Sequence, residues 1–135
     1  MKIKPIIKNP LTSIFIVVLV FSIIYINGRN SEDDYREKVL NKPELTTGTV
    51  TNVEFKSRVG YEVQFYFSAN NGEIHSKTSF GDIVSLQHFI INKQFPIIFS
   101  SVNPNYNMIL ILPEDFKDYN VPFPDSLNWV LQYVK

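Results

Sequence analysis

The longest apolar run of the chain lies near its N-terminus, and no charged residue interrupts it. As a helix, the sixteen residues from Leu11 to Ile26 span about 24 Å, and extension back through Pro10 brings this toward the ~30 Å of a bilayer core. The run is apolar on all sides, which disfavours a helix at the surface of a soluble core. The pattern predicts a transmembrane helix over residues 11–28, after a short basic tail at residues 1–10.

A cleaved signal peptide is the main alternative, because it also begins with basic residues and an apolar stretch. The run ends in the sequence Tyr25-Ile26-Asn27-Gly28-Arg29. This is a poor cleavage site, since it lacks small residues at the required spacing. We therefore expect a retained anchor, while a cleaved signal and a soluble helix stay open as alternatives.

Residues 29–44 are polar and charged, and they predict a stalk next to the membrane. Within it, Ser31 followed by Asp34 is a helix start signal, and Pro43 is a stop signal. We expect a short helix from Ser31 through Leu40.

Residues 45–135 predict one β-rich globular domain. Alternation of apolar and polar residues indicates strands over 46–56, 61–68 and 73–80. In the first strand we expect Thr51, Val53 and Phe55 on one face. The second alternates most cleanly: Tyr61, Val63, Phe65 and Phe67 against Glu62, Gln64, Tyr66 and Ser68. Asn71-Gly72 between the second and third strands is a strong hairpin signal, so the three form an antiparallel meander.

The rest of the domain predicts two more strands and two helices. Apolar residues at helical spacing indicate a helix from residue 81 to 92, strands follow over 95–102 and 108–112, and Asp125 is placed to cap a last helix. The stripe of that last helix consists of Leu127, Val130, Leu131 and Val134. The expected fold class is mainly β: a small antiparallel rolled sheet or barrel of about five strands, with one or two flanking helices and a single preceding transmembrane helix.

Charge divides unevenly between the two parts of the chain. Residues 1–30 carry four basic residues and no acid, whereas residues 31–135 carry nine basic and thirteen acidic residues. An acidic domain lacks the positive surface that nucleic acid requires, so we expect no nucleic-acid partner. The chain has no cysteine, which excludes disulfides and thiolate metal sites.

The numbers of basic residues in the segments flanking the apolar run, before and after it, are equal, so they do not decide the orientation of the helix in the membrane. Lys2, Lys4 and Lys8 lie close before the apolar run, and Arg29, Arg36 and Lys38 follow it. The proximity of the lysines and the free amino group favour a cytoplasmic tail. We therefore expect a single-pass protein of the cell membrane whose C-terminal domain lies on the periplasmic or extracellular side.

Residues 48–104 carry a recognisable series of signals. Gly48-Thr49-Val50 opens it, Tyr61 to Phe67 follows as Y-x-V-x-F-x-F, Asn71-Gly72 comes next, and Phe95-Pro96-Ile97-Ile98-Phe99 leads to Asn103-Pro104. The series resembles an uncharacterised family of small bacterial membrane-anchored proteins with a compact β domain of unknown function. The resemblance implies a fold and a membrane location, and it implies no catalytic residues.

Candidate catalytic and metal-binding groups are sparse. His75 and His88 could share a metal with Asp82 or Glu73, but histidines thirteen residues apart lack the tight spacing of zinc ligands, so surface positions are the better interpretation. No serine sits in a Gly-x-Ser-x-Gly turn.

The acidic residues after Pro113 are paired carboxylates that could serve acid–base chemistry. Glu114, Asp115 and Asp118 fit stabilisation of a helix N-terminus better. We predict no catalytic, cofactor-binding or metal-binding residues and no cofactor.

Two aromatic residues fall off the expected core faces. Tyr66 lies on the polar face of its strand, and Trp129 lies beside the stripe of the last helix. They are the candidate contact patch. The expected function is that of a membrane-tethered, non-enzymatic protein-interaction domain, with the membrane and another envelope protein as partners. The alternative is a small-molecule or lipid-binding β domain with a pocket lined by Val63, Phe65 or Phe99.

Overall fold

A computed structural model describes residues 10–134, with side chains from residue 14 onward except Asn27, Arg29 and Asn30. The basic tail predicted at residues 1–10 therefore lies outside the described part, apart from Pro10. The chain divides into two compact units, and the boundary falls between Arg36 and Glu37. Each unit is described by itself.

Helix α1 (Pro10–Val39) contains the predicted apolar segment. Every described side chain from residue 14 to 26 is exposed, and Ser22 satisfies its hydroxyl by donating to the Val18 carbonyl at 2.8 Å. Among the described residues, α1 is the one helix long and apolar enough to cross a membrane, although a signal sequence near an N-terminus has the same character.

The short helix expected from Ser31 is instead the last part of α1. The residues between Gly28 and Val39 include neither proline nor a second glycine, and Glu32, Arg36, Glu37 and Lys38 are good helix formers, so nothing interrupts the helix there. It ends before Lys42, whose φ of 52° is left-handed.

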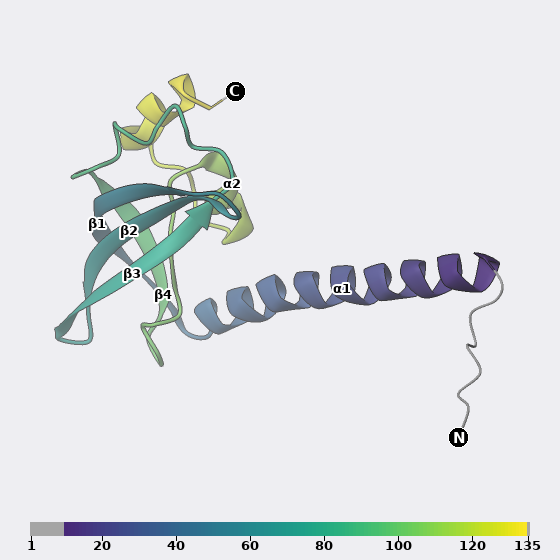
Figure 1. Ribbon diagram of the computed structural model, residues 1–135. Helices are drawn as coiled ribbons and strands as arrows, with labels where there is room; N and C mark the ends of the chain where they lie inside the picture. Colours follow the sequence, from purple (N-terminus) through teal and green to yellow (C-terminus); the bar gives the residue numbers. More distant parts are fainter. Residues whose placement is uncertain (1–9, 135) are drawn as a thin grey trace. The chain divides into compact units, whose positions relative to one another are not determined.

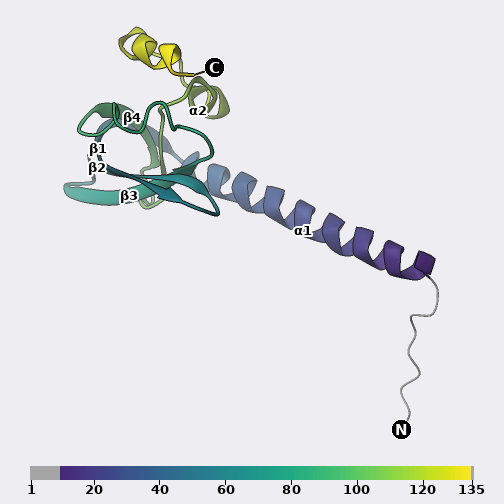
Figure 2. The same cartoon turned by 45° about the horizontal axis from the view of Figure 1, so that its top comes forward.

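The second unit contains a five-stranded antiparallel sheet, as predicted (Figure 1). Its strands are β1 (Pro43–Lys56), β2 (Gly60–Ala69), β3 (Gly72–Phe80), β4 (Gln94–Ser100) and β5 (Asn107–Ile109), in the order β3-β2-β1-β4-β5. The sheet curls into a half-barrel (Figure 2). The fold class expected from the sequence is confirmed.

Strand β2 shows why the sheet has one buried face. Val63, Phe65 and Phe67 are at most 1% exposed, as the alternation predicted. Asn70 and Asn71 both have positive φ, at 49° and 64°, which gives the two-residue turn that joins β2 to β3.

Strand β1 departs from the expected alternation at Thr51. A β-bulge between Val50 and Asn52 shifts the register, so that Val50 and Val53 turn toward the core while Thr51 is exposed. The Thr51 hydroxyl donates to the Gln64 carbonyl at 3.1 Å. The prediction that Thr51 shares a face with Val53 was therefore wrong.

No regular helix forms between residues 81 and 93. Ile83, Leu86 and Ile90 are buried, as helical spacing predicted, but the segment is a series of turns. Its end is held to β1 at the bulge, because Asn92 N–H donates to the Val50 carbonyl at 2.8 Å and Val50 N–H donates to the Lys93 carbonyl at 3.0 Å. With these two hydrogen bonds the end of the segment joins β1 at the bulge, and the segment does not continue as a helix.

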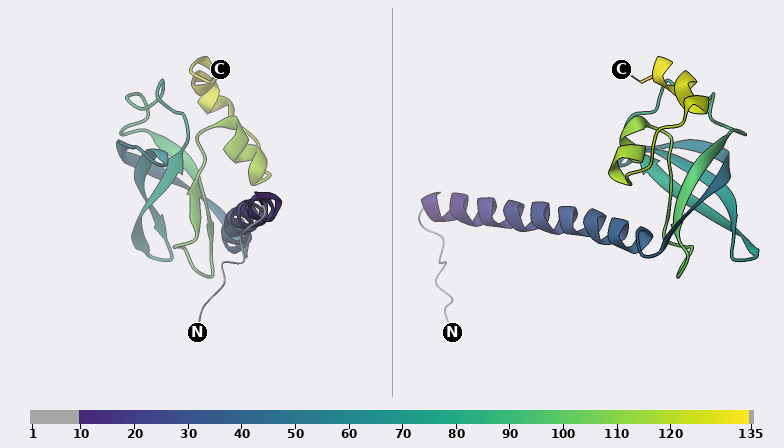
Figure 3. Two further views of the ribbon diagram at one scale, coloured as in Figure 1. Left: turned by 45° about the vertical axis from the view of Figure 1, so that its right-hand side comes forward. Right: turned by 180° about the vertical axis from the view of Figure 1, so that it is seen from behind.

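Two short helices complete the domain, α2 (Pro113–Asp118) and the 3₁₀ helix η1 (Asp125–Gln132). They lie together beside the curled sheet (Figure 3). Phe116 of α2 is buried against Phe123, with ring centroids 5.0 Å apart. Asp125 is the first residue of η1 and makes no capping hydrogen bond, while Pro124 occupies the cap position, so the expected cap was wrong.

Candidate binding site

The geometry of η1 determines which of its side chains reach the core. A 3₁₀ helix has three residues per turn, so Leu127, Val130 and Tyr133 share one face. Leu127 and Val130 are buried, but Leu131 is 48% exposed. The α-helical stripe predicted for Leu131 was therefore wrong, because that residue is rotated away from the core by the tighter winding.

Trp129 is half-buried at the edge of the core. Its ring lies 6.3 Å from Phe95, a fully buried residue of β4, and 6.3 Å from Tyr133 in an edge-to-face arrangement. The Lys93 ammonium lies 5.7 Å from the centre of the indole, which places a positive charge on the aromatic face. Trp129 thus has one side fixed by packing and another beside a cation.

Phe89 extends this aromatic surface. Its ring lies 4.8 Å from Tyr133, and 48% of the residue is exposed to solvent. We call Phe89, Trp129 and Tyr133, together with Lys93, the aromatic patch. Sequence reasoning missed Phe89 and Tyr133. The three-residue spacing of Leu127, Val130 and Tyr133 was the available signal for Tyr133.

A groove of about 360 Å³ adjoins the aromatic patch, and Tyr133 belongs to both. Its walls are mostly apolar, and Asp82 and Ser85 supply polar groups: the lining consists of Asp82, Ile83, Val84, Ser85, Leu86, Leu112, Tyr133 and Val134. Asp82 is fixed there because its carboxylate accepts from the Val84 N–H at 3.3 Å. Val84 is 50% exposed, so the apolar surface continues beyond the groove.

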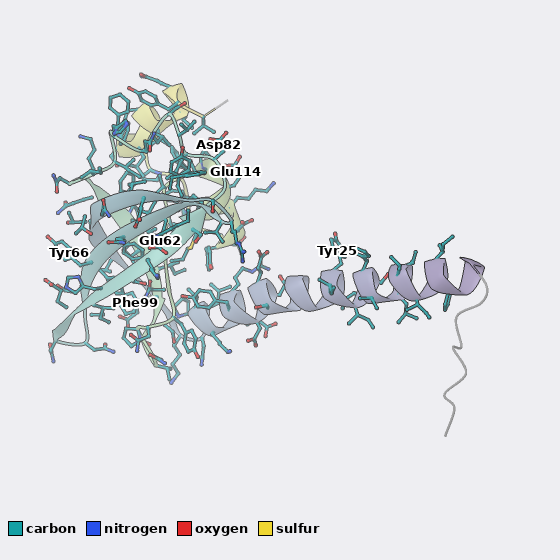
Figure 4. All side chains as sticks on the ribbon, viewed as in Figure 1. Tyr25, Glu62, Tyr66, Asp82, Phe99 and Glu114 are labelled. Carbon is teal, nitrogen blue, oxygen red and sulfur yellow. The ribbon has the colours of Figure 1, made fainter. Side chains whose placement is uncertain are left out.

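Tyr66 lies elsewhere, on the outer face of the sheet. Its strand neighbours Phe65 and Phe67 point into the core, so the Tyr66 side chain points away from it. Its ring lies 5.8 Å from the ring of His75 on β3. Figure 4 shows Tyr66 well separated from Asp82, which lines the groove. The two residues of the predicted contact patch, Tyr66 and Trp129, are therefore on different surfaces of the domain.

Charged groups surround Tyr66 on this outer face. Lys77 pairs with Glu62 at 3.1 Å, and His75 pairs with Glu73 at 2.8 Å. The hydrogen bond from Lys77 lowers the pKa of Glu62. A shallow hollow of about 340 Å³ lies beside these groups, lined by Thr51, Gln64, Phe65, His75, Ser76 and Lys77.

The pocket residues of the alternative prediction are core residues. Val63, Phe65 and Phe99 are at most 3% exposed, and Phe99 packs on Phe67 with centroids 5.5 Å apart. Neither Val63 nor Phe99 lines the groove or the outer hollow. Of the two hollows, the groove next to the aromatic patch is the more enclosed.

Among the described residues, no three His, Asp or Glu side chains gather as metal ligands would. His75 and His88 are both exposed, as expected for surface histidines. His75 lies beside Glu73, and within the described residues no third His, Asp or Glu side chain joins this pair as a metal ligand would.

Asp115 is a largely buried acid at the start of α2. Its carboxylate accepts from the Leu112 N–H at 2.7 Å and the Ile111 N–H at 3.0 Å. These bonds hold the start of α2, which supports the structural interpretation of the acidic residues after Pro113. Burial raises the pKa of Asp115 to about 6, although both N–H donors act in the opposite direction.

Comparison with known proteins identifies no relative. No family model, no curated protein and no solved structure matches the chain. These comparisons therefore do not identify a family for the chain. What stands is an N-terminal apolar helix followed by a small curled five-stranded antiparallel sheet.

Proposed function

We propose that this chain is a membrane-tethered, non-enzymatic protein-interaction domain whose contact surface is the aromatic patch. The supporting observation is the solvent exposure of Phe89, a large aromatic residue that is 48% exposed yet held by its contact with Tyr133. Rigid aromatic side chains at a surface supply much of the binding free energy in protein interfaces.

In this proposal α1 remains in the membrane as a single-pass anchor, and the domain lies on the periplasmic or extracellular side of a bacterial envelope. The exposed apolar surface of α1 supports the anchor, because such a surface is stable in lipid and costly in water. The resemblance to small membrane-anchored β-domain proteins belongs to the same proposal.

Lys93 adds a charge preference to the patch. Its ammonium lies over the indole of Trp129, so a partner would meet an aromatic surface bordered by positive charge. The expected partner presents an apolar side chain to Phe89 and Tyr133 and a carboxylate to Lys93.

Site-specific photo-crosslinking in living cells tests the proposal. A photoreactive phenylalanine analogue replaces Phe89 in the full-length chain, and the same analogue replaces Phe55 as the matched control. Phe55 is 64% exposed, on strand β1 and outside the patch. We expect one protein adduct from position 89 that is absent from position 55 and is lost on Tyr133→Ala substitution. Equal adducts at both positions, or none at position 89, would refute the proposal.

A second candidate function follows from the groove itself. Its volume of about 360 Å³ and its mostly apolar walls suit a small apolar molecule or a lipid chain, with Asp82 and Ser85 at the polar end. Mass spectrometry of the chain purified in a mild detergent tests this. A lipid that co-purifies with the wild type and is lost on Val84→Trp substitution, at a groove residue that is 50% exposed, would favour the second candidate over the first.

A further inference from the structure

Strand β3 forms one edge of the sheet, with β2 on one side and no strand on the other (Figure 2). The opposite edge strand, β5, approaches β3 where the sheet curls, and no ladder joins the two. An edge strand leaves half of its backbone groups without strand partners, and another strand can pair with them. β3 is nine residues long, so it offers a full strand to a partner.

The turn between β2 and β3 shows which backbone groups face the free edge. A two-residue turn with both φ values positive closes on a hydrogen-bonded pair, here Ala69 and Gly72. Hydrogen-bonded and non-hydrogen-bonded pairs then alternate along the ladder. Glu73, His75 and Lys77 fall in non-hydrogen-bonded pairs with β2, so their N–H and C=O groups point outward.

The side chains of these three residues are also accessible. The exposed fractions are 56% for Glu73, 71% for His75 and 67% for Lys77. The acid and the base lie symmetrically about the histidine, two residues to either side. The edge of one copy is therefore complementary in charge to the edge of a second copy that runs in the opposite direction.

We propose that two copies of this chain pair through β3, antiparallel and with the twofold axis at His75. In this register Glu73 of each copy lies opposite Lys77 of the other, and the two His75 residues face one another. The outward backbone groups of the three residues form about six hydrogen bonds across the interface. The two half-barrels thus join into one continuous sheet.

Other registers are disfavoured by the same charges. Hydrogen bonds form only when residues whose backbone groups point outward lie opposite each other. The twofold axis therefore passes through a residue of β3 and not between two residues. A shift of the axis to Ser76 places His75 opposite Lys77 and removes both attractive pairs. A shift to Ile74 places Glu73 opposite His75, which is charged only when protonated, and places Lys77 opposite the turn residue Asn71, outside the strand. Opposite charges directly across a ladder stabilise it, and like charges destabilise it, so the register centred on His75, with its two Glu73–Lys77 pairs, is the favoured one.

A single cysteine tests this register directly, because the chain has none of its own. In the proposed dimer the two Cα atoms of residue 75 lie about 5.5 Å apart, within the range of a disulfide. The two Cα atoms of residue 79 lie about 27 Å apart, although Ser79 is an exposed residue of the same strand. His75→Cys is therefore the test variant, and Ser79→Cys is its matched control.

Charge reversal in the His75→Cys background then tests the partner. Glu73→Lys alone places lysines opposite each other, and Lys77→Glu alone places glutamates opposite each other. Mixing the two variants restores both attractive pairs in a mixed dimer. Each variant alone should dimerise about tenfold more weakly than the His75→Cys chain, and the mixture should regain the loss as the mixed species.

The experiment uses the full-length chain in detergent, with micelles in excess, mild oxidation and a non-reducing gel. The emission of Trp129, the one tryptophan, confirms that each variant is folded. We expect dimer from His75→Cys, little from Ser79→Cys, and recovery on mixing. Equal dimer from both cysteine positions, or dimer formation that charge reversal leaves unchanged, would overturn the proposal, as would monomer throughout.

Discussion

Replacement of Asp115 by asparagine should remove a pH dependence from the stability of the domain. The carboxyl group is largely buried at the start of α2, where it accepts two backbone N–H groups from Ile111 and Leu112. Burial raises its pKa from 3.8 to about 6. Asparagine keeps an oxygen acceptor for the backbone and has no proton to lose.

The magnitude follows from the two pKa values. Between pH 3.8 and about pH 6 the folded chain holds a proton on Asp115 that the unfolded chain has lost. The unfolded state then binds fewer protons, so the free energy of unfolding falls as the pH rises through this window. About two pKa units at 1.36 kcal/mol each correspond to about 3 kcal/mol. The Asp115→Asn variant lacks this contribution, so its stability relative to wild type should rise by that amount.

Urea unfolding of the full-length chain in a nonionic detergent, followed by Trp129 fluorescence, measures the difference. Wild type and Asp115→Asn are compared from pH 4 to pH 7, because their difference cancels the titration of the other acids. We expect the variant to gain about 3 kcal/mol relative to wild type, most of it below pH 6. A difference that is flat with pH would show that the two N–H donors cancel the effect of burial, and one that favours wild type increasingly as pH rises would show that they outweigh it. Either result would refute the reasoning.

Three further predictions concern packing, and urea unfolding measures each. Gly48→Ala should cost about 1–3 kcal/mol, because the added Cβ would lie 2.7 Å from Cγ1 of Ile97. Gly60→Ala should cost at least about 1 kcal/mol, since Gly60 has a φ of +85° and its added Cβ would clash with the Phe80 carbonyl; an unchanged midpoint would contradict this. Phe65→Ala should cost about 3–5 kcal/mol, because Phe65 is 1% exposed in the core, and a loss below about 1 kcal/mol would argue against that packing.

Local patterns in the sequence predicted much of the sheet. The alternation from Tyr61 to Phe67 identified β2 and its buried face, and Asn71-Gly72 identified the hairpin, although the two turn residues are Asn70 and Asn71. Both signals act within a few residues, so no distant contact was needed to interpret them. The bulge at Thr51 was not predicted, because β-branched residues occupy both faces there and alternation alone does not fix the register.

Conformations that depend on distant contacts were not predicted. The spacing of Ile83, Leu86 and Ile90 fits both a helix and a series of turns, and the bonds to Val50 decide between them. The contact of Phe89 with Tyr133 joins segments far apart in the sequence. The aromatic patch therefore appears only when the chain is folded, although Trp129 could be singled out beforehand.

Extraction of native membranes, followed by measurement of the mass of the recovered chain, is the most direct test of the central proposal that the anchor is retained. The full-length chain with a C-terminal epitope is expressed, and membranes are washed at alkaline pH. Because α1 exposes apolar side chains from residue 14 to 26, we predict that the chain stays in the membrane with residues 11–28 intact. A freely soluble chain whose N-terminus lies near Asn27 would contradict the account.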